Sequence, residues 1–559
     1  MSIKDGLKSL SEPRYYNIYY YIVGGFVYIF TISLLIYSNF LSGPVLLNND
    51  HAAEMVFSYL LYQEGGLLSQ NWYYSTEIRL LGIHNVYSVL FNFITDWQLV
   101  QAIGNFILLA LMILSYFFLC LQMKLQKSLI FLTSSLLLLM PSVIFLEMLG
   151  RLAFYIPHMI FAFLYLGIFL SMQKLRDKPA ILKLLSLTLF ILLSVIGGLA
   201  GFRYIKDVLV PLAICTLVVF FKSDSFQAYR KSMKISQLID VKNSKEFFYL
   251  LMSLTGGLFM FVGWVVNTRI LSQLYTFHSY SNTLISPIQH IISNVIPQAF
   301  DHFFGTIGYR TAVDVVSVVG MLNIILLLFI PLMVFFMRFR ENSPIIDTSH
   351  KIAFYFCPAA ILVITFFSLI TDLVVNRYFI PGIVLFIPML CVYMNHSKIK
   401  FDKILIFVLV IGLFGINTYR TTRDVVHDSQ VRYITRYADV EATLLENNLT
   451  LGYATFWNSD IFTYLTNGEI EVVSIQEDFT PFRWLSRKEH YIEDTASGTA
   501  FLLLNNVEYQ SFIEREVAYF GSLLFSNDHY TIVLYDAAFL QSYILAHDKA
   551  AFLDEHNAP

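Results

Sequence analysis

Long uninterrupted apolar stretches constrain this chain more than any other feature of its sequence. Residues 19–38 and 320–336 are typical, since each lacks charged residues and is long enough as a helix to cross about 30 Å of hydrocarbon. Only 14% of the 559 residues are charged, whereas a soluble protein has about 25%. The sequence therefore predicts a polytopic α-helical membrane protein. Because the first apolar run lacks a small-residue cleavage site, we expect it to be retained as a helix.

Eleven segments satisfy this length and polarity criterion. They cover residues 18–40, 97–122, 127–147, 152–172, 180–200, 204–222, 246–268, 312–337, 352–374, 378–395 and 402–419. With the N-terminus inside, the cytoplasmic segments hold twenty-one Lys and Arg residues and the opposite loops hold seven. Because this bias sets orientation, we expect a cytoplasmic N-terminus and, after an odd number of spans, an extracytoplasmic C-terminus.

The composition changes near residue 420. Residues 1–419 have a net charge of +9, whereas residues 420–559 carry nine basic and twenty-one acidic residues, a net charge of −12. We therefore expect a transmembrane domain over 1–419 and a soluble C-terminal α/β domain over 420–559.

The tail's pattern alternates between strands and helices. Strands are predicted at 451–456, 469–475, 499–506 and 531–536, with one helix ending at Leu465 and another over about 508–520. Asn458 or Ser459 is the expected cap of the first helix, and Asn467-Gly468 its stop. No dinucleotide-binding or Walker motif occurs.

Two of the outer loops are long, 41–96 and 269–311. The first places Asp50, His51 and Glu54 within five residues, followed by apolar residues at helical spacing over 53–61. This pattern predicts an amphipathic helix lying at the membrane interface. The stretch SQNWYYSTEIR (69–79) then adds three consecutive aromatic residues, a Glu and an Arg.

Short outer loops place further charges at the same level. They hold Glu147, Arg151, Arg203 and Arg377. Charges at membrane depth are costly and usually face a cavity or a functional path. A carboxylate can take a proton from an attacking hydroxyl, and arginines can hold a phosphate in bidentate fashion. The pattern suits a reaction at the outer membrane surface.

The layout resembles the GT-C superfamily of membrane glycosyltransferases, including the protein O-mannosyltransferases and aminoarabinose transferases. The matching features are Asp50 after the first span, the long first outer loop with interfacial helices, and RYFIP (377–381) opening a late span. The resemblance implies a hexosyltransferase of the bacterial plasma membrane. Its donor would be a polyprenyl-phosphate-linked sugar, and its acceptor an envelope glycan, lipid or protein at the outer face.

The resemblance maps the candidate base onto Asp50. Several relatives have two adjacent acids there, whereas this chain has Asp50-His51 and its next acid at Glu54. The predicted site has three groups of residues: catalytic Asp50 and Glu54; lipid-phosphate-binding Arg377, Arg203, Arg151 and Tyr378; and substrate-binding Trp72, Tyr73, Glu77 and Glu147.

Each assignment has a structural alternative. Asp50 is also a favoured helix cap, Glu54 suits an interfacial surface charge, and Arg377 suits a headgroup anchor. Arg203 follows Gly197, Gly198 and Gly201, where backbone can approach a ligand, but it can also pair with Asp207. Glu147 and Arg151 suit an i,i+4 ion pair, and Trp72, Tyr73 and Tyr74 suit interfacial anchoring.

Metal ligands and disulfides are not predicted. Cys120, Cys215, Cys357 and Cys391 all fall inside apolar runs, and the histidines lack the spacing of a zinc site. A divalent cation, Mg²⁺ or Mn²⁺, held by Asp50, Glu54 and pyrophosphate oxygens is compatible with the sequence. Nothing in the sequence points to nucleic acid.

Three other functions remain open. A lipid or polysaccharide transporter or flippase predicts paired interrupted helices and an internal repeat, and the sequence shows neither. A glycan polymerase or ligase using the same carriers would depend on the second long loop, at Asp301 or His302. A catalytically inactive scaffold would bind the carrier without turnover.

Overall fold

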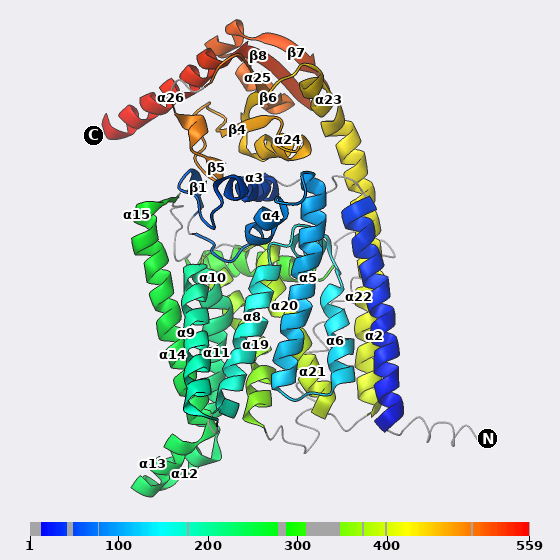
Figure 1. The fold of residues 1–559 in the computed structure, drawn as a ribbon, viewed down its shortest axis with the longest axis vertical. Helices are drawn as coiled ribbons and strands as arrows, with labels where there is room; N and C mark the ends of the chain where they lie inside the picture. The colour runs from blue at the N-terminus through cyan, green and yellow to red at the C-terminus, as the bar shows by residue number, and fades with distance from the viewer. Residues whose placement is uncertain are drawn as a thin grey trace, which may run out of the picture. The chain divides into compact units, whose positions relative to one another are not determined.

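The computed structural model describes residues 13–41, 49–75, 78–175, 178–277, 287–308, 347–371, 374–396, 400–492 and 496–557 (Figure 1). The chain divides into two compact units that alternate along the sequence. The first, here called the helical unit, contains residues 1–37, 105–268 and 281–423. The second, here called the α/β unit, contains residues 38–104, 269–280 and 424–559. The α/β unit thus joins the first long loop and part of the second to the tail.

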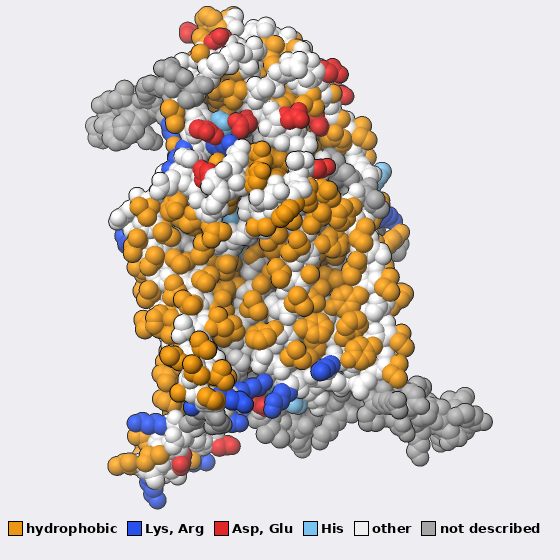
Figure 2. Space-filling view, viewed as in Figure 1, with side chains coloured by type: hydrophobic (Ala, Val, Ile, Leu, Met, Phe, Trp, Pro, Cys, Tyr) orange, Lys and Arg blue, Asp and Glu red, His pale blue; other side chains and the backbone are white. Residues whose placement is uncertain are grey.

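Long apolar helices dominate the helical unit. They are α2 (Pro13–Ile36), α5 (Trp97–Gln122), α6 (Lys127–Ser135), α8 (Ile156–Met172), α9 (Ala180–Leu199), α11 (Val210–Phe221), α14 (Lys245–Val265), α19 (Thr348–Thr371), α21 (Phe386–His396) and α22 (Lys400–Arg432). Within the described ranges, eight helical stretches are long and apolar enough to cross a membrane. Hydrophobic side chains form a broad belt over these helices (Figure 2). The protein is therefore a polytopic membrane protein, as predicted.

Eight of the predicted spans coincide with these stretches. The single span predicted over 127–147 is wrong, because α6 and the segment Val143–Arg151 are bent by 105° relative to each other. The break contains Pro141, which cannot donate a backbone hydrogen bond and restricts the residue before it. The predicted span 312–337 lies outside the described residues, and 402–419 falls within α22.

Glycines bring α9 and α14 into backbone contact. A Cβ added to Gly198 would lie 1.9 Å from the Met260 carbonyl oxygen, and one added to Gly263 would lie 2.2 Å from that of Val195. Small residues allow this close approach between membrane helices. Gly198 therefore serves helix packing, and the predicted role of this glycine in approaching a ligand needs correction.

The tail forms a five-stranded sheet in the order β4, β3, β6, β8, β7. Its strands are β3 (Leu451–Thr455), β4 (Glu471–Ile475), β6 (Thr499–Asn505), β7 (Ser522–Ser526) and β8 (Tyr530–Asp536). β3 is parallel to β4 and β6, while β8 is antiparallel to β6 and β7. The helices are α24 (Ser459–Leu465), α25 (Asn506–Phe512) and α26 (Ala537–Asn557). The predicted α/β tail is confirmed.

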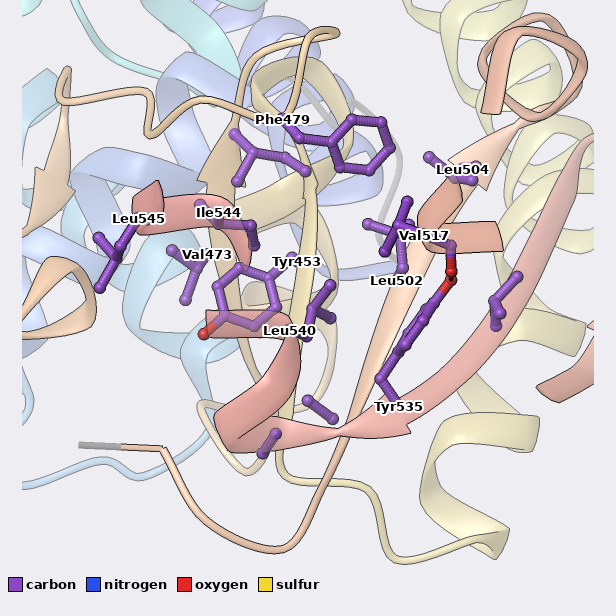
Figure 3. Packing of buried hydrophobic residues seen from close by; sticks show 14 of the residues in the cluster. Tyr453, Val473, Phe479, Leu502, Leu504, Val517, Tyr535, Leu540, Ile544 and Leu545 are labelled. Atoms are coloured by element: carbon purple, nitrogen blue, oxygen red, sulfur yellow. Dashed lines mark hydrogen bonds between the residues drawn. The ribbon is translucent and has the colours of Figure 1, made fainter. Parts of the chain in front are cut away.

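The core of this sheet is aromatic and aliphatic. Tyr453, Leu502 and Tyr535 from the sheet pack with Leu540 and Ile544 of α26 (Figure 3). Two local predictions need correction. The helix predicted over 508–520 ends at Phe512, and the strand β7 that follows it was missed.

A second, three-stranded sheet links distant parts of the chain. β1 (Trp72–Tyr74) pairs in parallel with β2 (Thr276–Phe277) and antiparallel with β5 (Ser486–Arg487). The first loop also contributes α3 (Asn49–Glu64) and α4 (His84–Leu90). α3 is buried on nearly all sides and packs against α4 and α24. The prediction of an amphipathic helix lying at the membrane interface is therefore wrong.

Candidate active-site residues

Asp50 lies in the first turn of α3. The helix begins at Asn49, so Asp50 is not the N-cap residue, and the predicted helix start near His51 needs correction. An acidic residue in the first turn is still favoured by the helix dipole. The start of α3 is anchored by Asn49, whose Nδ2 donates to Asp460 Oδ2 at 3.2 Å. Asp50, half-buried, is thus on a helix whose first turn is tied to α24.

Glu54 is buried one turn further along α3, with 4% of its surface exposed. Its Oε1 accepts a hydrogen bond from the Arg79 guanidinium, and its Oε2 lies 3.3 Å from His84 Nδ1. Burial acts to raise the pKa of Glu54, but the charge of Arg79 and the hydrogen bond with His84 outweigh it and lower the pKa to about 2. Glu54 is therefore a buried, permanently ionised carboxylate, and the interpretation as a surface charge is wrong.

The imidazole of His84 is held from three sides. Its Nδ1 faces Glu54, and the Phe57 ring meets it edge-on with 5.0 Å between centroids. A Cβ at Gly82 would lie 2.3 Å from His84 Cε1, so no larger residue fits there. Sequence reasoning missed Arg79 and His84, which follow Glu54 by 25 and 30 residues. Only the fold brings these side chains together.

These side chains line a cavity of about 320 Å³ within the α/β unit. Its other walls are Ala53, Phe57, Trp72, Tyr74, Ser75 and Leu485. Trp72 thus lies beside Glu54. Tyr73 points to the opposite face of β1, as alternation along a strand requires. There it packs against Tyr491, with 5.8 Å between ring centroids, and Lys488 lies 5.5 Å over its ring. The predicted Glu77 lies outside the described residues.

A cationic cluster occupies the helical unit. Arg203 belongs to α10 (Phe202–Tyr204), and Arg377 to the 3₁₀ helix Asn376–Phe379. The Arg203 guanidinium lies 5.2 Å from the ring centroid of Tyr155 and 5.6 Å from that of Tyr378. Arg377 also interacts electrostatically with Tyr155. The structure therefore brings together Arg203, Arg377 and Tyr378, which are distant in sequence.

Lys206 extends the cationic cluster, although the sequence did not single it out as a site residue. Its ammonium lies 5.4 Å over the Tyr378 ring and 3.2 Å from Asp207 Oδ1. Asp207 is buried. The carboxylate considered as a partner of Arg203 thus has an ion pair with its chain neighbour.

Arg151 and Glu147 share the π-helix Leu146–Arg151 of the helical unit. Arg151 is buried, with 4% of its surface exposed, and its carbonyl oxygen accepts a hydrogen bond from Asn105 Nδ2. Glu147 is half-buried. Their predicted roles in phosphate and substrate binding remain predictions.

A metal centre finds little support in the described ranges. No three His, Cys, Asp or Glu side chains are grouped there as potential ligands. Glu54 fits a metal poorly, because both its oxygens already face donors, Arg79 and His84. The four cysteines are buried and free. We therefore derive no step through a divalent cation, and its involvement stays a prediction.

Comparisons with known proteins place the chain far from its neighbours. No family model matches the sequence, and no curated protein matches it significantly. Among solved structures, ArnT from Cupriavidus metallidurans bound to undecaprenyl phosphate is similar, with a TM-score of 0.49 and 11% identity over 91% of this chain and 98% of ArnT. The apo ArnT structure gives 0.41 and 10% over 92% and 98%. At TM-scores below 0.5, neither a ligand nor a reaction is transferred from ArnT to this chain.

Proposed function

We propose that the protein is a GT-C-type glycosyltransferase. It transfers a sugar from a polyprenyl-phosphate carrier to a hydroxyl of an envelope glycan, lipid or protein at the outer face of the bacterial plasma membrane. The observation that carries the proposal is the clustering of Arg203, Lys206 and Arg377 around Tyr155 and Tyr378. Guanidinium groups bind phosphate in bidentate fashion and stabilise it as it leaves.

An apolar cavity in the same unit supports a prenyl donor. It has a volume of about 560 Å³ and is lined by Leu136, Leu137, Leu139, Phe145, Ile383, Val384, Phe386, Ile387, Leu390 and Phe414. No charged side chain lines it. Such a space suits part of an isoprenoid chain, whose transfer from water is favourable in proportion to the buried area.

In the proposed reaction, a base removes the proton of the acceptor hydroxyl. The oxygen attacks the anomeric carbon, the bond from that carbon to the phosphate oxygen breaks, and the phosphate leaves with the electron pair. Asp50 is the base predicted from the sequence. Arg203 and Arg377 would bind the departing phosphate.

The proposed orientation places the N-terminus in the cytoplasm and the tail outside. Its support is the distribution of charge. Basic residues gather at the end of the helical unit beside α12 (Asp224–Ser232) and α13 (Ile235–Asn243) (Figure 2), as the cytoplasmic enrichment of Lys and Arg requires.

Native mass spectrometry of the purified protein tests the lipid-phosphate site. We expect a co-purified polyprenyl-phosphate species on the wild type and its loss from Arg377→Ala. Arg230→Ala is the matched control, because Arg230 is an exposed cation of α12. Absence of any carrier from a folded wild-type protein would contradict the proposal. A carrier bound without any sugar transfer would favour a flippase or an inactive scaffold.

A further inference from the structure

The pair formed by Glu54 and His84 has a defined proton arrangement. An ionised carboxylate only accepts hydrogen bonds, and Glu54 is ionised because of its low pKa of about 2. The contact between Glu54 Oε2 and His84 Nδ1, 3.3 Å long, therefore requires the proton to be on Nδ1. In the neutral ring, Nε2 then carries the basic lone pair.

The second ring nitrogen is not used by the fold. His84 Nε2 is buried and has no hydrogen-bond partner among the residues that the structure describes. The His84 side chain is 2% exposed and lines the 320 Å³ cavity. A buried polar atom without a partner is costly, by about 1–3 kcal/mol. Such a cost is commonly found where a ligand supplies the missing partner.

Glu54 itself is a poor base for this cavity. A general base works best with a pKa near the operating pH, whereas the pKa of Glu54 lies near 2. Its ion pair with Arg79 also occupies its other oxygen. Glu54 is instead suited to orienting the imidazole and to stabilising the imidazolium that forms when the ring accepts a proton.

We propose, as a refinement that rests on the proposed function, that His84 is the proton acceptor of the transfer reaction and that the cavity around it receives the acceptor hydroxyl. His84 Nε2 takes the hydroxyl proton while the oxygen bonds to the anomeric carbon. The bond from that carbon to the phosphate oxygen breaks, and the phosphate leaves with the electron pair. Glu54 is the positioning residue, and Asp50 is not the base.

The walls of the cavity match a sugar hydroxyl as the acceptor group. Trp72 and Phe57 provide aromatic surface, with 5.0 Å between their ring centroids, and Ser75 and Arg79 provide polar groups. Saccharides combine apolar ring faces with hydroxyl edges, so this mixture favours a glycan acceptor over an apolar alcohol.

The tautomer can be measured without turnover. In the wild-type protein labelled with ¹⁵N-histidine and reconstituted in nanodiscs, NMR at neutral pH should show His84 protonated on Nδ1 and unprotonated on Nε2. The His84→Asn protein identifies the signal. A proton on Nε2 in the neutral ring would overturn the proposal, since no lone pair would then face the cavity.

Transfer assays distinguish His84 from Asp50. In His84→Asn, the amide nitrogen can still donate to Glu54, but the basic nitrogen is lost. We expect kcat to fall about 100-fold or more, with carrier binding unchanged, whereas Asp50→Asn retains most activity. His529→Asn is the control, because His529 lies in the turn between β7 and β8. Should His84→Asn fold poorly, restoration of transfer in His84→Ala by added imidazole provides the second measurement.

The outcomes separate this inference from the proposed function. Transfer that survives in His84→Asn but is lost in Asp50→Asn would overturn the role of His84 and leave the glycosyltransferase intact. A wild type that neither binds carrier nor transfers sugar would overturn both.

Discussion

At the residue scale, environment decides what a carboxylate does. Asp50 and Glu54 are one helical turn apart, yet Glu54 is buried between Arg79 and His84 while Asp50 is half-buried. The sequence indicated the acidic cluster and Trp72. It could not indicate Arg79 and His84, because no short-range spacing links a residue to partners brought to it by chain folding.

Glu54→Gln tests the buried ion pair. The pKa of Glu54 is lowered from 4.5 to about 2, so the ionised group contributes stability that is present above pH 4.5 and is lost as the pH falls towards 2. The shift corresponds to roughly 3 kcal/mol. We expect the variant to be less stable than the wild type at pH 7 by that order, with the difference shrinking below pH 4. Thermal unfolding in one detergent measures it, and an equal loss at both pH values would contradict the assignment.

Asp460 predicts the opposite pH dependence. Burial raises its pKa from 3.8 to about 7, although Asn49, Ser459 and Arg487 counteract this. A raised pKa contributes stability below pH 3.8 that is lost as the pH rises through 7, in total roughly 4 kcal/mol. Asp460→Asn should remove this dependence and stabilise the protein at pH 8. The new amide can also donate to Asn49 Oδ1, which has no partner among the described residues. Unchanged pH dependence of the melting temperature would contradict this.

At the element scale, hydropathy located most helices correctly because an apolar run must be buried in lipid or protein. It could not separate these two environments for α3. The same apolar spacing that suits a membrane interface suits a helix covered by α4 and α24. The break at Pro141 was equally ambiguous, since proline is tolerated within membrane helices.

Two glycines of α14 test helix packing. At Gly263 a Cβ would meet the Val195 carbonyl oxygen at 2.2 Å, while at Gly257 the nearest atom, Leu209 Cδ1, is 3.5 Å away. Gly263→Ala should destabilise the protein by about 1–3 kcal/mol through overpacking. Gly257→Ala should be neutral or slightly stabilising, because alanine favours helix by about 1 kcal/mol. Melting temperatures of the two variants provide the comparison, and equal values would show that the α9–α14 contact adjusts freely.

At the scale of the whole molecule, composition revealed the acidic tail, because charge content differs sharply across residue 420. It could not reveal which loops join that tail. The sheet of β2, β1 and β5 takes its strands from three regions more than 190 residues apart. Strand pairs of two or three residues leave no sequence pattern, and their partners are chosen only when the chain folds.

The composition of the α/β unit predicts cooperative unfolding of distant segments. Asn467 Oδ1 accepts from the Trp97 backbone N–H at 2.8 Å, and Arg487 Nη2 donates to Gln63 at 3.2 Å. Segments that share such contacts and a common core open together as one unit. Under mild denaturant, hydrogen exchange of α3 and β1 should therefore become fast at the same concentration as exchange of β3 and β4. If α3 instead exchanged in step with α8 and α14, the first loop would belong energetically to the helical unit. The proton acceptor proposed for His84 would then lose the support of the tail that covers it.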